Sequence, residues 1–284
     1  MKNLLFLTDF SETSKNAFVY ALSMAASIRA SVHILHIVPV IPPKDEEEAF
    51  SIHPVAQMIN QQTEQIEWGK FRAEATLLEN IAKNHNLQEV PVEFHFIDGY
   101  FSEVVESFVQ QNNIDAVVVG SAKKNTVDRK LFGTHTGKLL EILSVPLLAV
   151  PSKAAYSQIN KFAVGVLMND AETKNIEHIA GRLRVFGNSL QCIHIVKTKE
   201  EYQKAQSEKE RWLSKFSHRN VSLDIKLSSS TIRGLEEYVG AEKIDVLCTL
   251  HRHLTFLQRI FTKTVSTTLL ENERTTVLIF NFDE

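Results

Sequence analysis

The sequence predicts an α/β protein with two similar domains, each a five-stranded parallel sheet flanked by helices. Three observations predict it. At 284 residues the chain is longer than one typical domain, and two domains of about 140 residues are expected. Short β-branched runs alternate with longer amphipathic stretches, as in doubly wound parallel sheets with right-handed crossovers. The second half repeats the first, which indicates duplication of a whole fold.

The first half contains five expected strands and four expected helices. The strand over 116–119 is almost pure valine, which is typical of a parallel strand that is buried on both faces. Apolar residues recur at helical spacing from Ala17 to Ile28, so a helix follows the first strand. The expected strands cover 4–8, 32–38, 92–97, 116–119 and 145–150, and the other expected helices cover 54–85, 101–110 and 136–143.

The repeat is visible as a constant offset. An offset of 130 aligns residues 115–150 with residues 245–280 without a gap. Farther upstream LTDFSET resembles LMNDAET, which would place Asn169 opposite Asp9. We expect the two copies to be related by a pseudo-two-fold axis, with one domain over 1–151, a linker over 152–159 and a second domain over 160–284.

Composition and charge exclude several classes of function. The formal net charge of −3 does not predict a nucleic-acid-binding surface. No apolar run approaches the roughly 18 residues of a membrane-spanning helix. Asp9 interrupts the short apolar run at the N-terminus, so we expect no export signal. Cys192 and Cys248 form no CxxC pattern and imply no disulfide framework. We expect a cytoplasmic protein without nucleic-acid or membrane partners.

Asp9 follows the first strand, at the end of the sheet where open α/β proteins bind ligands. A carboxylate at this place can accept hydrogen bonds from a ribose or help to hold a phosphate-bound metal ion. Asp9 also suits a structural role as the N-cap of the next helix, which Ser11 could fill as well. The residues alone leave both roles open.

The segment from Gly120 to Thr136 follows the valine-rich strand. Gly120 permits close backbone approach at the carboxyl end of that strand. The segment ends at a Gly-Thr step into a helix, whose free amides and dipole favour an anion. Several basic residues make the loop positive, but it contains no Walker A pattern. A surface loop without a ligand is the alternative.

The order of these motifs resembles the universal stress protein family over residues 1–150, and more faintly over 160–280. The motifs are T-D-F-S after the first strand, H-I-V-P, V-V-V-G-S and the G-T helix start. The resemblance implies Rossmann-like domains of the adenine nucleotide alpha hydrolase type, and a site for ATP, with Mg²⁺, in members that carry a G-x2-G-x9-G-[S/T] loop. By position it implies ligand contacts at Thr8, Asp9, Ile37, Val119, Gly120, Lys123, Gly133, Thr134, His135 and Thr136.

Lys123 departs from the family's loop, because it stands where the second glycine belongs. A lysine there either fills the pocket or reaches a phosphate as a point charge. In the second half the loop is nearly lost, since Leu250 replaces Gly120 and Lys263 replaces Gly133. We expect this half to be the permanent partner of the first, through pairing of the last strands.

No catalytic residue and no metal site is expected. No nucleophile has a base placed beside it by sequence spacing. Cys248, His251 and His253 form C-x2-H-x-H, but a buried strand cysteine beside loop histidines is far commoner than a zinc site. His33 and His36 are three residues apart in a strand and should face opposite sides of the sheet.

Three functions from different classes follow. The first is a stress-response protein that binds ATP or another adenine nucleotide in its N-terminal domain without fast turnover. The second is a nucleotide-independent interaction or scaffold module, and the third is a slow ATPase or self-phosphorylating protein. Enzymatic activity is therefore left open, with no positive signal for it. We expect an intramolecular pseudo-dimer, and a further homodimer is an open alternative.

Overall fold

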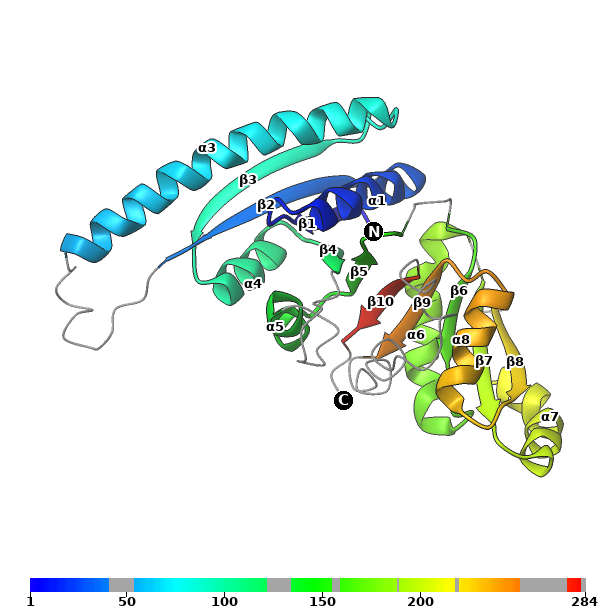
Figure 1. Ribbon diagram of the computed structural model, residues 1–284. Helices are drawn as coiled ribbons and strands as arrows, with labels where there is room; N and C mark the ends of the chain where they lie inside the picture. Colours follow the sequence, from blue (N-terminus) through cyan, green and yellow to red (C-terminus); the bar gives the residue numbers. More distant parts are fainter. Residues whose placement is uncertain are drawn as a thin grey trace.

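A computed structural model places both halves of the chain in one continuous sheet, with helices on both of its faces (Figure 1). Where strand and helix alternate, the prediction from the sequence is confirmed, and element ends differ by only a few residues. The structure describes residues 1–40, 54–121, 134–154, 159–187, 189–217, 220–250 and 275–281.

The described elements of the N-terminal half alternate strand and helix throughout. They are β1 (Asn3–Leu7), α1 (Glu12–Ile28), β2 (Ser31–Pro39), α3 (Pro54–Asn84), β3 (Val92–Gly99), α4 (Phe101–Gln111), β4 (Ala116–Ser121), α5 (Thr134–Ile142) and β5 (Leu147–Pro151).

The C-terminal half follows the same order. Its described elements are β6 (Phe162–Gly165), α6 (Thr173–Leu183) between the short 3-10 turns η1 (Asp170–Glu172) and η2 (Arg184–Phe186), β7 (Leu190–Val196), α7 (Lys199–Leu213), β8 (Val221–Leu227), α8 (Thr231–Ala241), β9 (Val246–Leu250) and β10 (Thr276–Phe280).

The described strands form a single ten-stranded sheet in the order β3-β2-β1-β4-β5-β10-β9-β6-β7-β8. Neighbouring strands within each half are parallel. Among the described strands, β5 and β10 are the one antiparallel pair. Each half is thus a doubly wound parallel sheet with helices on both faces, and the predicted fold class is confirmed.

Pairing of β5 with β10 relates the halves by a pseudo-two-fold axis. Leu148 pairs with Leu278, and the offset of 130 makes these two residues equivalent. On either side of this pair the register crosses over: Leu147 pairs with Ile279, and Ala149 with Val277. A register that is symmetric about one pair of equivalent residues is what a two-fold relation between the halves requires, and this prediction is also confirmed.

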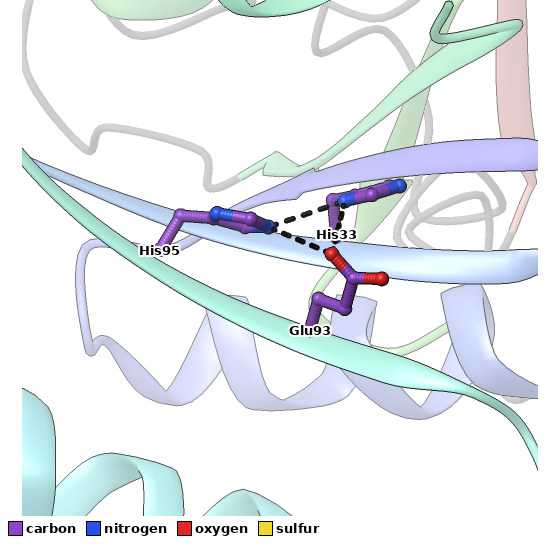
Figure 2. A group of neighbouring side chains, drawn as sticks. All are labelled: His33, Glu93 and His95. Atoms are coloured by element: carbon purple, nitrogen blue, oxygen red, sulfur yellow. Dashed lines mark hydrogen bonds and ion pairs between the residues drawn. The ribbon is translucent and has the colours of Figure 1, made fainter. Parts of the chain in front are cut away.

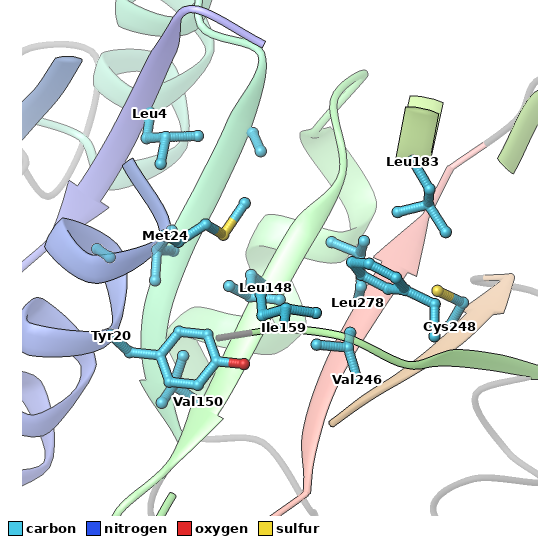
Figure 3. Close-up of a cluster of buried hydrophobic side chains, with 14 of the residues drawn as sticks. Leu4, Tyr20, Met24, Leu148, Val150, Ile159, Leu183, Val246, Cys248 and Leu278 are labelled. Atoms are coloured by element: carbon cyan, nitrogen blue, oxygen red, sulfur yellow. The ribbon is translucent and has the colours of Figure 1, made fainter. Parts of the chain in front are cut away.

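Each face of the sheet carries an apolar core that continues from one half into the other. Helices α1, α3, α6 and α7 contribute to the first core, and α4, α5 and α8 contribute to the second. Figure 3 shows the first core at the junction, where Leu148 of β5 and Leu278 of β10 lie within one cluster. The contact between the halves is therefore an interior of the molecule, and it is stabilised by apolar burial as any core is.

Two sets of side-chain hydrogen bonds hold the strands in the same way in both halves. The carboxylate of Asp115 accepts hydrogen bonds from the backbone amides of residues 2 and 3, and Asp245 does the same for residues 160 and 161. Nδ1 of His36 lies 3.0 Å from the carbonyl oxygen of Thr8. A carbonyl oxygen only accepts, so Nδ1 carries the proton and donates it. In the second half, His194 donates in the same way over 2.8 Å.

These hydrogen bonds correct one pair in the alignment of the two halves. The second histidine donates to the carbonyl of Val166, so Thr8 is equivalent to Val166, and Asp9 lies opposite Leu167. Asn169 is instead equivalent to Ser11, since both are N-caps whose side chains accept from the amide three residues on. The alignment of similar residues had placed Asn169 opposite Asp9. The hydrogen bonds at the two strand ends show which residues are structurally equivalent, and they place Leu167 there.

Gly120 lies where β4 meets the first turn of α1. A Cβ added at this position would lie 2.8 Å from the carbonyl oxygen of Thr13 and 3.1 Å from the amide nitrogen of Ser14. Both neighbours are backbone atoms that cannot rotate away. The close backbone approach expected of Gly120 is therefore an approach of its own chain, which packs α1 against β4.

Helix α3 buries part of its apolar surface and exposes the rest. Phe71 and Leu78 are buried. Ile66 and Trp68 are 60% and 43% exposed and lie outside the core, although the ring of Trp68 packs against Phe71 and Phe96. The helix has 31 residues and lies along the outermost part of the sheet beside β3, so some of its apolar side chains have no element above them (Figure 1). No helix in the described ranges is long and apolar enough to span a membrane.

We expect Gly120→Ala to lower the free energy of unfolding by about 1–3 kcal/mol, because the added methyl group forces α1 away from β4. The matched control is Gly69→Ala in α3, where an added Cβ meets nothing within 4 Å. This control should raise the free energy of unfolding by about 0.5–1 kcal/mol. Urea unfolding followed by circular dichroism measures both changes, and a Gly120→Ala protein as stable as the wild type would contradict the packing role.

Burial lowers the pKa of His36, although its bond to Thr8 and the nearby carboxylate of Glu67 act in the opposite direction. Between its folded and unfolded pKa values, His36 therefore binds fewer protons in the folded state than in the unfolded state. Its contribution to the free energy of unfolding is complete above the unfolded pKa of about 6.5, and it is lost as the pH falls toward the folded pKa. The stability difference between wild type and His36→Gln should therefore shrink between pH 7 and pH 5. Paired denaturant titrations measure it, and a difference independent of pH would refute this account.

Candidate functional site

The carboxyl ends of β1 and β4 form the place where the fold expects a ligand. In the order β3-β2-β1-β4-β5 the crossovers change direction between β1 and β4, and such switch points leave a crevice outside the strand ends. Leu7, the last residue of β1, is paired with Val119. Thr8 and Asp9 therefore continue past β1 beside Gly120, and the structure brings these sequence-predicted residues to one edge of the sheet.

Thr8 and Asp9 are held by a tight local network. The hydroxyl of Thr8 is buried and accepts hydrogen bonds from the amide of Phe10 at 3.2 Å and the hydroxyl of Ser14 at 2.9 Å. Oδ1 of Asp9 accepts from both the amide and the hydroxyl of Ser11, at 3.1 and 2.6 Å. This is an Asx-type turn, and it holds the exposed carboxylate in one orientation.

The structure settles which residue caps α1. Ser11 is the N-cap, and its hydroxyl accepts a hydrogen bond from the amide of Ser14 at 3.2 Å. Phe10 has a φ of 63°, in the left-handed region that a bulky residue rarely adopts. Asp9 thus stabilises the turn before the helix and is not the cap itself. Among the described residues, both hydrogen bonds of the Asp9 carboxylate use Oδ1, so Oδ2 is the oxygen that could bind a ligand.

Ile37 and Val119 flank this turn on the two neighbouring strands. Leu35 of β2 is paired with Leu7, so Ile37, two residues farther on, reaches the level of Asp9. Val119 is buried and Ile37 is half-buried, and both belong to the apolar core on the α4 and α5 face. They supply an apolar floor at the strand ends, next to the carboxylate.

The remaining sequence-predicted residues lie in or after the loop that follows β4. Lys123 and Gly133 fall outside the described residues. Helix α5 begins at Thr134, so His135 and Thr136 belong to its first turn. The amides of that turn lack partners within the helix and are the groups that bind anions at helix N-termini.

A row of stacked aromatic side chains lies beside Asp9, and the sequence analysis did not predict it. The ring of Phe10 stacks on His36 with a centroid distance of 4.0 Å, and Phe71 and Trp68 of α3 continue the stack at 6.2 and 5.7 Å. The spacing of Trp68 and Phe71, about one helical turn apart, was the available signal in the sequence. Nothing in the sequence places α3 above the end of β2, so that signal by itself indicates packing alone.

A second carboxyl group lies on the same side. Glu74 of α3 is buried, and burial raises the pKa of its carboxyl, with the Lys15 ammonium acting against the rise. Its Oε1 has no hydrogen-bond partner among the described residues. The charges of Asp9 and Glu12 add to the rise. The α3 side of the site is therefore aromatic and acidic.

The described residues at the corresponding place in the second half are apolar. Leu167 stands at the position of Asp9 and is 63% exposed, and Leu250 stands at the position of Gly120 and is buried. A leucine offers neither a hydrogen-bond acceptor nor room for close backbone approach. The chemistry of a polar ligand site is thus confined to the first half, within the residues that the structure describes.

Comparison with known proteins identifies the family. The model of the universal stress protein family matches residues 1–151, more than half of the chain. A universal stress protein of Methanocaldococcus jannaschii is 25% identical over 156 residues, which cover 54% of this chain and 96% of the relative.

Solved structures resemble the chain along its whole length. A universal stress protein from Archaeoglobus fulgidus covers 98% of both chains with a TM-score of 0.64 and 13% identity. A structure of a Pseudomonas aeruginosa protein has a TM-score of 0.52 and 13% identity, and covers 99% of this chain and 93% of its own. At these identities the likeness concerns the fold alone. With the match of the family model, it follows that the chain belongs to the universal stress protein family and carries two domains of its fold in one sheet.

Proposed function

We propose that this chain is a cytoplasmic stress-response protein that binds ATP, or another adenine nucleotide, in its N-terminal half without fast turnover. The observation that carries the proposal is that Asp9 and Gly120 lie side by side, just past the paired ends of β1 and β4, at the switch point of the N-terminal sheet. Open α/β sheets bind nucleotides in that crevice. The family membership of residues 1–151 supports the same half of the chain.

Each part of the crevice has a distinct task in this proposal. Oδ2 of Asp9 accepts hydrogen bonds from ribose hydroxyls, and the Asx-type turn keeps the carboxylate oriented while it does so. Ile37 and Val119 contact the base with apolar surface. The phosphates lie toward the first turn of α5, where backbone amides and the helix dipole favour negative charge, and Mg²⁺ accompanies them.

The second half takes the role of a permanent partner. Leu167 and Leu250 stand in place of Asp9 and Gly120, so the described residues at these two positions offer no carboxylate to a ribose. One nucleotide per chain is therefore expected. The pairing of β10 with β5 gives this half a structural task that needs no ligand.

ATP with Mg²⁺ should raise the melting temperature of the wild type, because a ligand that binds only the native state stabilises it by mass action, by about 2.7 kcal/mol at a hundred times Kd. Asp9→Asn should abolish the rise, since it removes the charge and keeps an oxygen that can accept from Ser11. The matched control is Leu167→Ala at the equivalent position of the second half, which should leave the rise intact. A thermal-shift titration measures all three.

Calorimetry on the same proteins gives the stoichiometry, for which one nucleotide per chain is expected. Lys123→Gly in the same titration decides how that lysine acts. Tighter binding means that the side chain fills the pocket, and weaker binding means that it contacts a phosphate. No heat and no thermal shift at millimolar nucleotide would refute the proposal.

A second candidate function is an interaction module, and the exposed apolar side chains of α3 favour it. Met58, Ile66, Trp68 and Leu77 are 52%, 60%, 43% and 38% exposed. Apolar side chains gathered on one exposed helix are typical of a protein contact surface. A further homodimer through α3 is the simplest such contact.

If α3 forms this homodimer, sedimentation should show concentration-dependent association of the wild type that Ile66→Glu abolishes, because a buried unpaired carboxylate opposes the contact. A control substitution on the side of the same helix opposite Ile66, Glu64→Lys, should leave association unchanged. A wild type that stays monomeric at high concentration would exclude self-association through α3.

A further inference from the structure

Three potential metal ligands meet on the opposite face of the N-terminal sheet from α3. His33 comes from β2, and Glu93 and His95 come from β3 (Figure 2). His33 is paired with Glu93 in the parallel register, and His95 follows two residues later on the same face. Figure 2 shows the three side chains converging from adjacent strands.

The ligand atoms have the spacing of a metal site. Nδ1 of His33 lies 3.1 Å from Nε2 of His95 and 3.5 Å from Oε2 of Glu93, and the last two atoms are 3.7 Å apart. A point equidistant from the three atoms lies about 2.0 Å from each, which is the length of zinc bonds to histidine nitrogen and carboxylate oxygen. No large rearrangement is needed to bring all three atoms onto one ion.

The two imidazoles are held in place by packing. Phe108 of α4 contacts both rings edge-on, at centroid distances of 5.9 Å to His33 and 4.8 Å to His95. The side chain of His33 is 10% exposed and that of His95 is 24% exposed, whereas Glu93 is 65% exposed. The cluster therefore opens to solvent beside Glu93, which gives an ion a path in and leaves a coordination position for water.

Burial lowers the pKa of His95, and the neighbouring His33 lowers it further. At 3.1 Å one ring nitrogen must donate its proton to the other, so one ring carries its N–H on the atom that faces its partner. Binding of a metal ion by both atoms requires that ring to move the proton to its other nitrogen. No proton leaves the protein in this exchange.

The second half provides a comparison within one chain. Gln191, Asp224 and Tyr238 occupy the positions of His33, His95 and Phe108. The Tyr238 hydroxyl donates to Asp224 over 2.5 Å and lies 3.4 Å from the side-chain oxygen of Gln191. The polar groups of these three side chains are thus satisfied by one another. In the first half a phenylalanine stands in place of the tyrosine and cannot satisfy the polar groups, so the histidines and the carboxylate face each other.

We propose that His33, Glu93 and His95 bind a divalent transition-metal ion of the zinc type, with water completing a four-coordinate site. Two imidazoles and one carboxylate form a ligand set that zinc takes when one position stays open to water. His33 is paired with Leu5, four residues before Asp9, which is about 13 Å along a strand. The site is therefore separate from the nucleotide crevice, and it stands whether or not nucleotide binds.

The probe is Zn²⁺ itself, with Co²⁺ as a spectroscopic substitute, added to the full chain. The wild type should bind one more equivalent of Zn²⁺ in calorimetry than either Glu93→Gln or His95→Ala, or bind that ion at least tenfold more tightly. Co²⁺ should give the visible absorption of a four-coordinate site in the wild type and in neither of these two variants, and Zn²⁺ should remove that absorption. Mg²⁺ should not compete, because it prefers oxygen ligands.

The control is His85→Ala, an exposed histidine at the end of α3, which should bind Zn²⁺ like the wild type. Circular dichroism of each variant without metal confirms that the fold is retained, and the partly exposed positions of Glu93 and His95 were chosen for that reason. Equal Zn²⁺ stoichiometry and affinity in all four proteins would overturn the proposal, as would a wild type that gives no four-coordinate Co²⁺ spectrum.

Discussion

The antiparallel pairing of β5 with β10 is the interaction on which the rest of the structure depends. Leu147, Leu148 and Ala149 on one strand, and their partners on the other, are buried on both faces of the sheet. Either half alone would expose this strand as a flat apolar edge, which is a site for aggregation. Paired, the two edges become the centre of a ten-stranded sheet, and both apolar cores continue across the junction. Because both copies are in one polypeptide, the effective concentration of each for the other is high.

Duplication within one chain allows the halves to diverge wherever the shared framework is not affected. The hydrogen bonds that hold the framework are present in both halves: Asp115 and Asp245 bind the first strand of each half, and His36 and His194 bind the end of that strand. The places that could take a ligand are not kept. In the second half a buried leucine stands in place of Gly120, and a hydrogen-bonded tyrosine stands in place of Phe108. Both ligand sites that we propose therefore belong to the first half.

At the proposed nucleotide crevice, packing and the proposed ligand contacts use the same residues. Gly120 is required for the fold because the backbone of α1 lies against it. Asp9 shapes the turn with Oδ1, and Oδ2 has no hydrogen-bond partner among the described residues. A structural task of Asp9 is therefore compatible with a task in ligand binding.

Local periodicity and the internal repeat determined the fold class, the order of strands and helices, and the two-fold relation of the halves, because helix and strand spacing and a constant offset are properties of the sequence itself. The same periodicity correctly put His33 and His36 on opposite faces, since His33 packs against Phe108 and His36 against Phe71. Alternation says which face a side chain takes, but not which neighbour it meets. The equivalence of Asp9 with Leu167 and the meeting of His33 with a carboxylate sixty residues away depend on interstrand register. Only the hydrogen-bonded tertiary structure decides that register.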